Sequence, residues 1–123
     1  KIIGFASHDY VLNILKRVSI SVIPSSWEEP FGRTSLEASS RGCATIISNR
    51  GGLPETITHG IILKKLNVTS VYKAIKNLIE NEEKRKLIQK EMLLSLAIPY
   101  LAQVYLAYIV FFSNVENPDS LKH

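Results

Sequence analysis

Two glutamates, Glu29 and Glu37, lie eight residues apart and enclose the segment EPFGRTSLE. Pro30 biases Glu29 toward an extended backbone. Gly32 permits close backbone approach, and the residues from about Arg33 onward are able to turn helically. Glu29 is therefore expected before a helix and Glu37 inside it, with the unpaired N–H groups of the first helical turn between the two carboxylates. Those N–H groups and the helix dipole suit a phosphate, whereas the carboxylates suit hydroxyl partners.

The start of this helix carries further polar groups. Backbone N–H groups at Phe31 and Gly32 are placed to reach a phosphate, and Thr34 adds a hydroxyl. Ordinary helix capping explains the same residues, and capping and phosphate binding do not exclude each other. Arg33 is either a phosphate partner or an exposed first-turn arginine.

A second candidate loop contains Gly51 and Gly52 within SNRGGLPETI. Two adjacent glycines allow the backbone to wrap closely around a ligand, and a plain tight turn is the alternative. Near the first loop, Glu28 is expected to be a solvated charge. Trp27 fits a core or rim aromatic better than a stacking platform.

The elements that position these loops follow from apolar periodicity. Strands are expected at 1–5, 19–26, 43–48 and 60–65, and helices at 7–18, from about 33 to 42, at 54–58, 68–81 and from 81 onward. Either Thr69 or Ser70 is expected to cap the helix over 68–81. Strands that alternate with helices through short links predict an α/β fold with a parallel sheet. The strand over 19–26 ends at Pro24 and Ser25, at the carboxyl edge where open α/β sheets place their ligands.

Composition limits the function classes. The chain has 123 residues, 46% of them apolar and 21% charged, which fits one small domain with a core. A net charge of +4 spread over scattered basic residues argues against nucleic-acid binding. The single cysteine, Cys43, excludes an internal disulfide and is expected to be a buried thiol, as suits a reducing compartment. His8 and His59 are isolated from other metal-ligating residues, so no metal site is expected.

The segment 92–112 is 21 residues long and carries no charge, and 113–123 is a polar tail. The segment 92–112 is just long enough to cross a bilayer as a helix, although Pro99 would kink that helix. Three explanations stay open: a membrane or interface segment, a hydrophobic helix that packs on the domain or a partner, and a tail altered by a shifted reading frame or truncation. The domain prediction is therefore 1–91, then a hydrophobic helix over 92–112, then the tail.

The blocks IPSSWEEPFG, EEPFGRTSLEASSRG and SNRGGLPETI resemble, in order and spacing, the E-x7-E signature region of the retaining group 1 (family 4) glycosyltransferases. The resemblance covers residues 1 to about 91. It implies a Rossmann-like parallel sheet with flanking helices, which corresponds to the second half of the nucleotide-sugar-binding domain of a GT-B enzyme. The acceptor domain and the basic pair that helps to hold the diphosphate would come from an N-terminal part that is absent from this chain.

The resemblance also implies roles for individual residues. Glu29 is assigned to catalysis through contacts with hydroxyls of the transferred sugar, and Glu37 to the ribose hydroxyls of the nucleotide. The donor sugar and diphosphate would be bound by Phe31, Gly32, Arg33, Thr34, Gly51 and Gly52. The implied reaction transfers a hexose with retention from a nucleoside diphosphate sugar to an unknown glycan or lipid acceptor, without a metal or other cofactor.

Two other classes of function stay open. One is a non-catalytic nucleotide-sugar-binding module completed by another chain, and the other is a small membrane-associated interaction protein in which the glutamate spacing is a coincidence. The expected location is the cytoplasm, with contact at the inner face of the membrane if residues 92–112 bind lipid.

Overall fold

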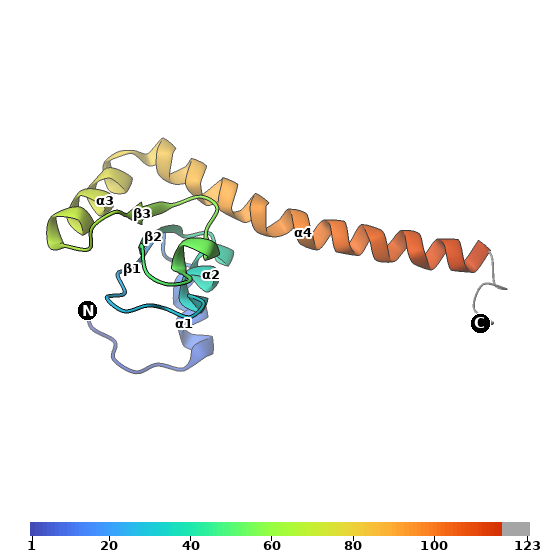
Figure 1. Cartoon of the computed structure of the whole chain (residues 1–123), viewed down its shortest axis with the longest axis horizontal. Coiled ribbons are helices and arrows are strands. Elements are labelled where there is room, and N and C mark those ends of the chain that lie inside the picture. Colours follow the sequence, from blue (N-terminus) through green and yellow to red (C-terminus); the bar gives the residue numbers. More distant parts are fainter. Residues whose placement is uncertain (117–123) are drawn as a thin grey trace. The chain divides into compact units, whose positions relative to one another are not determined.

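The computed structural model describes the backbone of residues 1–116 and the side chains of residues 1–99, 101–103 and 106. It divides into two units, Lys1–Leu93 and the segment from Leu94 onward. The elements, shown in Figure 1, are α1 (His8–Leu15), β1 (Ile20–Ile23), α2 (Arg33–Ser40), β2 (Ala44–Ser48), the 3-10 helix η1 (Leu53–Thr56), β3 (Ile61–Leu63), α3 (Val68–Glu80) and α4 (Glu82–Glu116). Helices and strands alternate from α1 to α3, as predicted.

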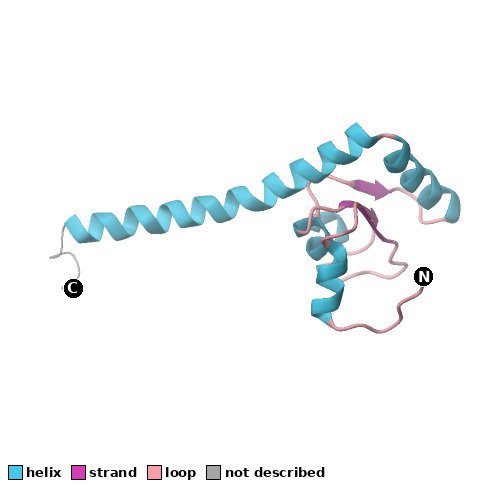
Figure 2. Ribbon diagram, turned by 180° about the vertical axis from the view of Figure 1, so that it is seen from behind, coloured by secondary structure: helices cyan, strands magenta, loops and turns pink. Residues whose placement is uncertain are grey.

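The three strands form one parallel sheet in the order β1-β2-β3 (Figure 2). Ile20 pairs with Ala44 at the start of the first ladder, and Ile46 pairs with Ile61 at the start of the second. Every residue of β2 is buried, because this strand has a neighbour on each edge and cover on each face. The structure thus confirms the α/β class and the parallel sheet.

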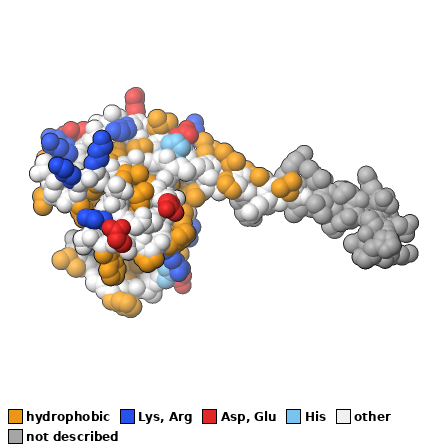
Figure 3. All heavy atoms as spheres, in the orientation of Figure 1, with side chains coloured by type: hydrophobic (Ala, Val, Ile, Leu, Met, Phe, Trp, Pro, Cys, Tyr) orange, Lys and Arg blue, Asp and Glu red, His pale blue; other side chains and the backbone are white. Residues whose placement is uncertain are grey.

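The core lies on both faces of β2 because successive side chains of a strand point to opposite faces. Ile46 belongs to one cluster and Ile47 to the other. The buried members of the two clusters are Ala44, Ile46, Leu63, Ala74 and Leu78 on one face, and Ile47, Leu53, Ile57 and Met92 on the other. Helix α3 therefore covers the first face through Ala74 and Leu78, and Figure 3 shows basic side chains gathered on its outer side.

Cys43 is fully buried immediately before β2. Its Sγ donates hydrogen bonds to the carbonyl oxygens of Val18 at 3.2 Å and Leu15 at 3.4 Å. Burial raises the pKa of the Cys43 thiol, so the neutral form is favoured. The predicted buried thiol is confirmed.

The predicted strand over residues 1–5 is wrong. This segment is irregular, and Ile2 and Phe5 are 98% and 104% exposed. A strand needs a ladder partner for its N–H and C=O groups, and none of the described strands pairs with residues 1–5. The apolar residues of KIIGF favoured a buried strand, but Ile2 and Phe5 are exposed in the structure.

The helix ends follow local capping chemistry. Ser7 caps α1 by accepting a hydrogen bond from the N–H of Tyr10. At α3 the cap is Asn67, whose Oδ1 accepts from the N–H of Ser70 at 2.8 Å. The prediction of Thr69 or Ser70 was wrong, because both residues lie inside the helix while Asn67 keeps an extended backbone just before it.

Helix α4 runs without a break from Glu82 to Glu116 and contains Pro99. The predicted boundary between residues 91 and 92 therefore falls inside one helix, and the boundaries of the domain prediction stay a prediction. In the described part of the chain, no helix combines the length and the apolar character that a membrane crossing requires. Of the predicted polar tail, residues 117–123 lie outside the described residues.

Candidate functional site

Glu29 lies in the loop that follows β1, beyond its carboxyl end. Its Oε1 accepts hydrogen bonds from the indole Nε1–H of Trp27 at 2.8 Å and from the hydroxyl of Ser25 at 3.0 Å. The Trp27 side chain is not part of a core, since the residue is 70% exposed. The sequence did not predict that Trp27 donates a hydrogen bond to Glu29, because this contact depends on how the loop folds back over two residues.

The glycine loop after β2 packs directly on the Glu29 segment. The N–H of Gly52 donates to the carbonyl oxygen of Glu29 at 2.7 Å. Gly51 has a φ of +51°, and a Cβ at this position would lie 2.2 Å from that same oxygen. A Cβ at Gly52 would lie 2.8 Å from the carbonyl oxygen of Pro30. Only glycines permit this contact, so the structure brings together the two predicted loops.

Glu28 also joins the two loops. Its Oε2 accepts from the N–H of Gly51 at 2.5 Å, and its Oε1 lies 3.3 Å from the guanidinium of Arg50. The prediction that Glu28 is only a solvated charge was wrong. The Glu28 carboxylate accepts the hydrogen bond of the Gly51 N–H, a backbone group that lies outside the strand ladders.

Helix α2 begins directly after these loops. Gly32 is its N-cap in the left-handed conformation, with φ +77°, and no side chain caps the helix. A Cβ on Gly32 would lie 2.7 Å from Leu53 Cδ2, so the glycine also lets η1 pack against the helix start. Phe31, Arg33 and Thr34 are exposed around this end. The first turn thus presents backbone N–H groups beside Glu29 and the glycine loop.

Glu37 lies one turn further along α2, with its side chain 19% exposed. Its Oε1 accepts from Arg33 Nε at 2.7 Å and lies 2.8 Å from His8 Nε2. The hydrogen bond from His8 is the main cause of a lowered pKa of the Glu37 carboxyl, and partial burial opposes it. Glu37 is therefore held as a carboxylate. No sequence pattern indicated the contact between His8 and Glu37, which arises because the N-terminus of α1 packs beside α2.

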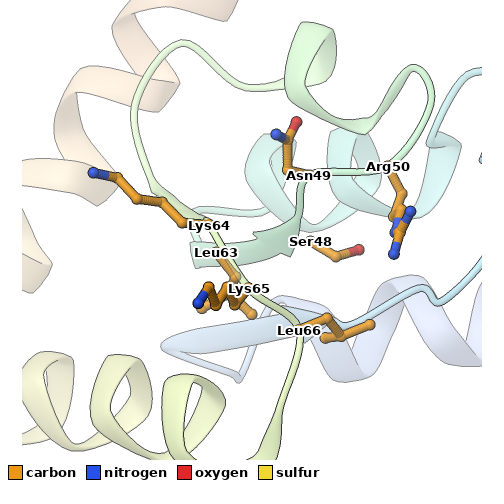
Figure 4. Close-up of a pocket in the computed structure, with 7 residues that line it drawn as sticks. All are labelled: Ser48, Asn49, Arg50, Leu63, Lys64, Lys65 and Leu66. Atoms are coloured by element: carbon orange, nitrogen blue, oxygen red, sulfur yellow. The ribbon is translucent and has the colours of Figure 1, made fainter.

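A pocket of about 360 Å³ lies at the carboxyl ends of β2 and β3 (Figure 4). It is lined by Ser48, Asn49, Arg50, Leu63, Lys64, Lys65 and Leu66. The Ser48 hydroxyl donates to the carbonyl oxygen of Ser25 at 2.7 Å, which links the pocket to the Glu29 loop. Figure 4 shows the ammonium of Lys64 extending away from the other lining groups, so the basic side chains do not converge.

Metal ligation finds no support in the described side chains, where no group of three or more His, Cys, Asp or Glu residues could hold an ion. The chemistry offered is instead two carboxylates, a helix N-terminus and a glycine loop at the carboxyl edge of a parallel sheet. This arrangement suits a ligand that has hydroxyl groups on either side of an anionic group.

Comparison with known proteins defines the class. The sequence model described as "Glycosyl transferases group 1" matches residues 1–92. The chain therefore belongs to the group 1 glycosyltransferase family.

Three relatives and one solved structure show how much of such a protein the chain represents. It is 38% identical over 60 residues to the glycogen synthase of Mycobacterium tuberculosis, which is 49% of this chain and 14% of that protein. It is 37% identical over 75 residues to spore coat protein SA of Bacillus subtilis, 58% of this chain and 20% of the relative. It is 38% identical over 60 residues to the 2-deoxystreptamine N-acetyl-D-glucosaminyltransferase of Niallia circulans, 49% of this chain and 15% of the relative.

The fold is similar to that of the sucrose-phosphate synthase of Thermosynechococcus elongatus. The TM-score is 0.69 at 23% identity, over 92% of this chain and 30% of that protein. Together with the family match, this likeness confirms the predicted fold, an α/β fragment of a GT-B glycosyltransferase.

Proposed function

We propose that this domain binds a nucleoside diphosphate sugar. The observation that carries the proposal is the packing of the glycine loop on the Glu29 segment, with the Gly52 N–H on the Glu29 carbonyl, beside the uncapped start of α2. In the proposed complex, Glu29 binds hydroxyls of the sugar and Glu37 binds the ribose hydroxyls. The diphosphate lies between them, near Gly51 and the first-turn N–H groups.

The proposed reaction is the transfer of a hexose with retention of the anomeric configuration. The positive end of α2 and the guanidinium of Arg33 would stabilise the negative charge that develops on the departing diphosphate. The exposed positions of Phe31 and Thr34 allow their groups to contact the sugar and the diphosphate. The scheme uses backbone amides for positive potential and needs no metal.

The acceptor and the rest of the active site belong to the proposal as well. The chain spans 14%, 20% and 15% of the length of the three curated relatives described above. We propose that sequence outside these 123 residues supplies the acceptor domain and the basic groups for the diphosphate, and that the acceptor is a glycan or lipid. Action at the inner face of a membrane stays a prediction.

A thermodynamic cycle tests the Glu37 assignment. Uridine, adenosine and guanosine diphosphates are titrated into the full chain by calorimetry, and the tightest binder is compared with its 2′-deoxy analogue. Loss of the 2′-hydroxyl is expected to weaken binding about 10-fold in the wild type, because a hydrogen bond to a carboxylate is lost. In Glu37→Ala the two ligands should bind with equal affinity.

The matched control is Glu83→Ala, which removes a carboxylate from an exposed position on α4. It should keep the full discrimination between the two ligands. Equal discrimination in Glu37→Ala and the wild type would remove the ribose assignment, and absence of binding by all three diphosphates would contradict donor binding by this domain.

A further inference from the structure

The two glutamates share one pattern of contacts. At Glu29, both donors, Trp27 Nε1 and Ser25 Oγ, contact the same oxygen, Oε1. The Ser25 hydroxyl also lies 3.4 Å from the carbonyl oxygen of Trp27, but its single proton is better placed for Glu29 at 3.0 Å. Oε1 of Glu29 therefore has two donors.

The same holds at Glu37. Arg33 Nε and His8 Nε2 contact its Oε1 at 2.7 and 2.8 Å. Because an ionised carboxylate only accepts, His8 Nε2 must carry the proton in this contact. The 3.5 Å approach of Arg33 Nη2 to the same nitrogen is then not a hydrogen bond, since both atoms are donors. Oε1 of Glu37 also has two donors, which come from α1 and from α2 itself.

The two glutamates also have in common that their other oxygen, Oε2, has acceptor sites left. Each carboxylate oxygen offers about two lone-pair sites, so two donors fill Oε1. Among the described residues, no hydrogen bond reaches Oε2 of either Glu29 or Glu37. Each Oε2 has two sites left, which matches the two hydroxyls of one vicinal diol.

We propose that Trp27 with Ser25, and His8 with Arg33, are positioning pairs that hold Glu29 and Glu37 by one oxygen and present the other to a diol of the donor. This inference rests on the proposed function and extends it, because it adds Trp27, Ser25 and His8 to the residues that control affinity and gives Arg33 a second role through its Nε. A fixed carboxylate binds a diol more tightly than a mobile one, since its rotamers are already restricted before the ligand arrives. Trp27 then affects binding of the transferred sugar through Glu29, and His8 affects binding of the nucleotide through Glu37.

The first experiment needs no ligand. Trp27 is the sole tryptophan of the chain, so its indole N–H gives a single resonance in a ¹⁵N–¹H spectrum of the full chain. Glu29→Gln replaces the charged acceptor by a neutral amide and should move this resonance upfield, because hydrogen bonds to charged groups are the stronger ones. The control Glu28→Gln should move it much less. An indole resonance that is unchanged by Glu29→Gln would overturn the Trp27 contact.

The second experiment measures two affinities for each variant, one for the nucleoside diphosphate and one for its hexose conjugate. Trp27→Phe keeps an aromatic ring but loses the N–H, and it should weaken only the conjugate, by roughly 3- to 10-fold. His8→Leu should weaken both ligands by a similar factor. His8→Gln, whose amide also donates, should restore most of the loss.

The outcomes separate this inference from the proposed function. Equal losses for both ligands in Trp27→Phe, or no rescue by His8→Gln, would overturn the positioning roles while donor binding stands. If the wild type bound neither ligand, the proposed function would fail, and with it the assignment of the pairs to a diol. The indole resonance would still report whether Trp27 fixes Glu29. Thermal unfolding of each variant shows whether an affinity loss reflects lost folding instead.

Discussion

Gly51→Ala is the sharpest test of the contact between the two loops. A Cβ at this position would lie 2.2 Å from the carbonyl oxygen of Glu29 and 2.6 Å from its backbone nitrogen. These atoms belong to the backbone, so a side-chain rotation cannot relieve the overlap. Gly51 also has a φ of +51°, which L-residues other than glycine adopt at a cost of about 1–2 kcal/mol.

The expected loss of stability follows from these two effects. Overpacking of a tight contact costs about 1–3 kcal/mol, so with the backbone cost the substitution should lower the free energy of unfolding by about 2–5 kcal/mol. Gly42→Ala is the matched control. Gly42 has a φ of +85°, but a Cβ there meets only Leu93 Cδ1, at an ordinary 3.7 Å. The control should therefore lose only about 1–2 kcal/mol.

Urea unfolding followed by far-UV circular dichroism measures both variants at one temperature and pH. The difference between Gly51→Ala and Gly42→Ala isolates the contact with Glu29, since both substitutions carry the left-handed backbone cost. If Gly51→Ala lost no more stability than Gly42→Ala, the close packing of the glycine loop on the Glu29 segment would be wrong.

Two further perturbations test the Asn67 cap of α3 and the ionised carboxylate of Glu37. Asn67→Ala removes the side-chain acceptor for the Ser70 N–H and should cost about 1 kcal/mol in thermal or urea unfolding, and an unchanged midpoint would contradict the cap. The lowered pKa of Glu37 means that its ionised form stabilises the fold above the ordinary value of 4.5 and that this contribution is lost as the pH falls through the folded-state pKa. The stability advantage of wild type over Glu37→Gln should therefore shrink below pH 4.5, and a pH-independent advantage would show that the contacts with His8 and Arg33 do not depend on the charge.

Much of the fold was predictable because local signals and packing agree. The continuous apolar run in 43–48 specified a strand buried on both faces, and Gly42 specified the end of α2. The strand over residues 1–5 shows the limit of such signals. Composition indicates a preference for burial, but it does not show whether a neighbouring strand exists to satisfy the backbone.

The candidate site was predictable in part for the same reason. Motif spacing placed Glu29, Glu37 and the glycines at loop and helix positions that the structure brings near the carboxyl edge of the sheet. The partners Trp27 and His8 were missed, because the Trp27 contact depends on the local conformation of the loop and the His8 contact depends on tertiary packing. His8 lies 29 positions before Glu37 in the sequence, and no periodicity relates the two residues.

The most direct test of donor binding is an amide chemical-shift map of the ¹⁵N-labelled full chain during titration with a nucleoside diphosphate. The largest shifts are expected at Arg33 and Thr34 in the first turn of α2 and at Gly51 and Gly52, because the diphosphate is proposed to lie against these backbone N–H groups. Shifts confined to residues 64–66, at the rim of the pocket between β2 and β3, or the absence of any saturable shift would contradict the account.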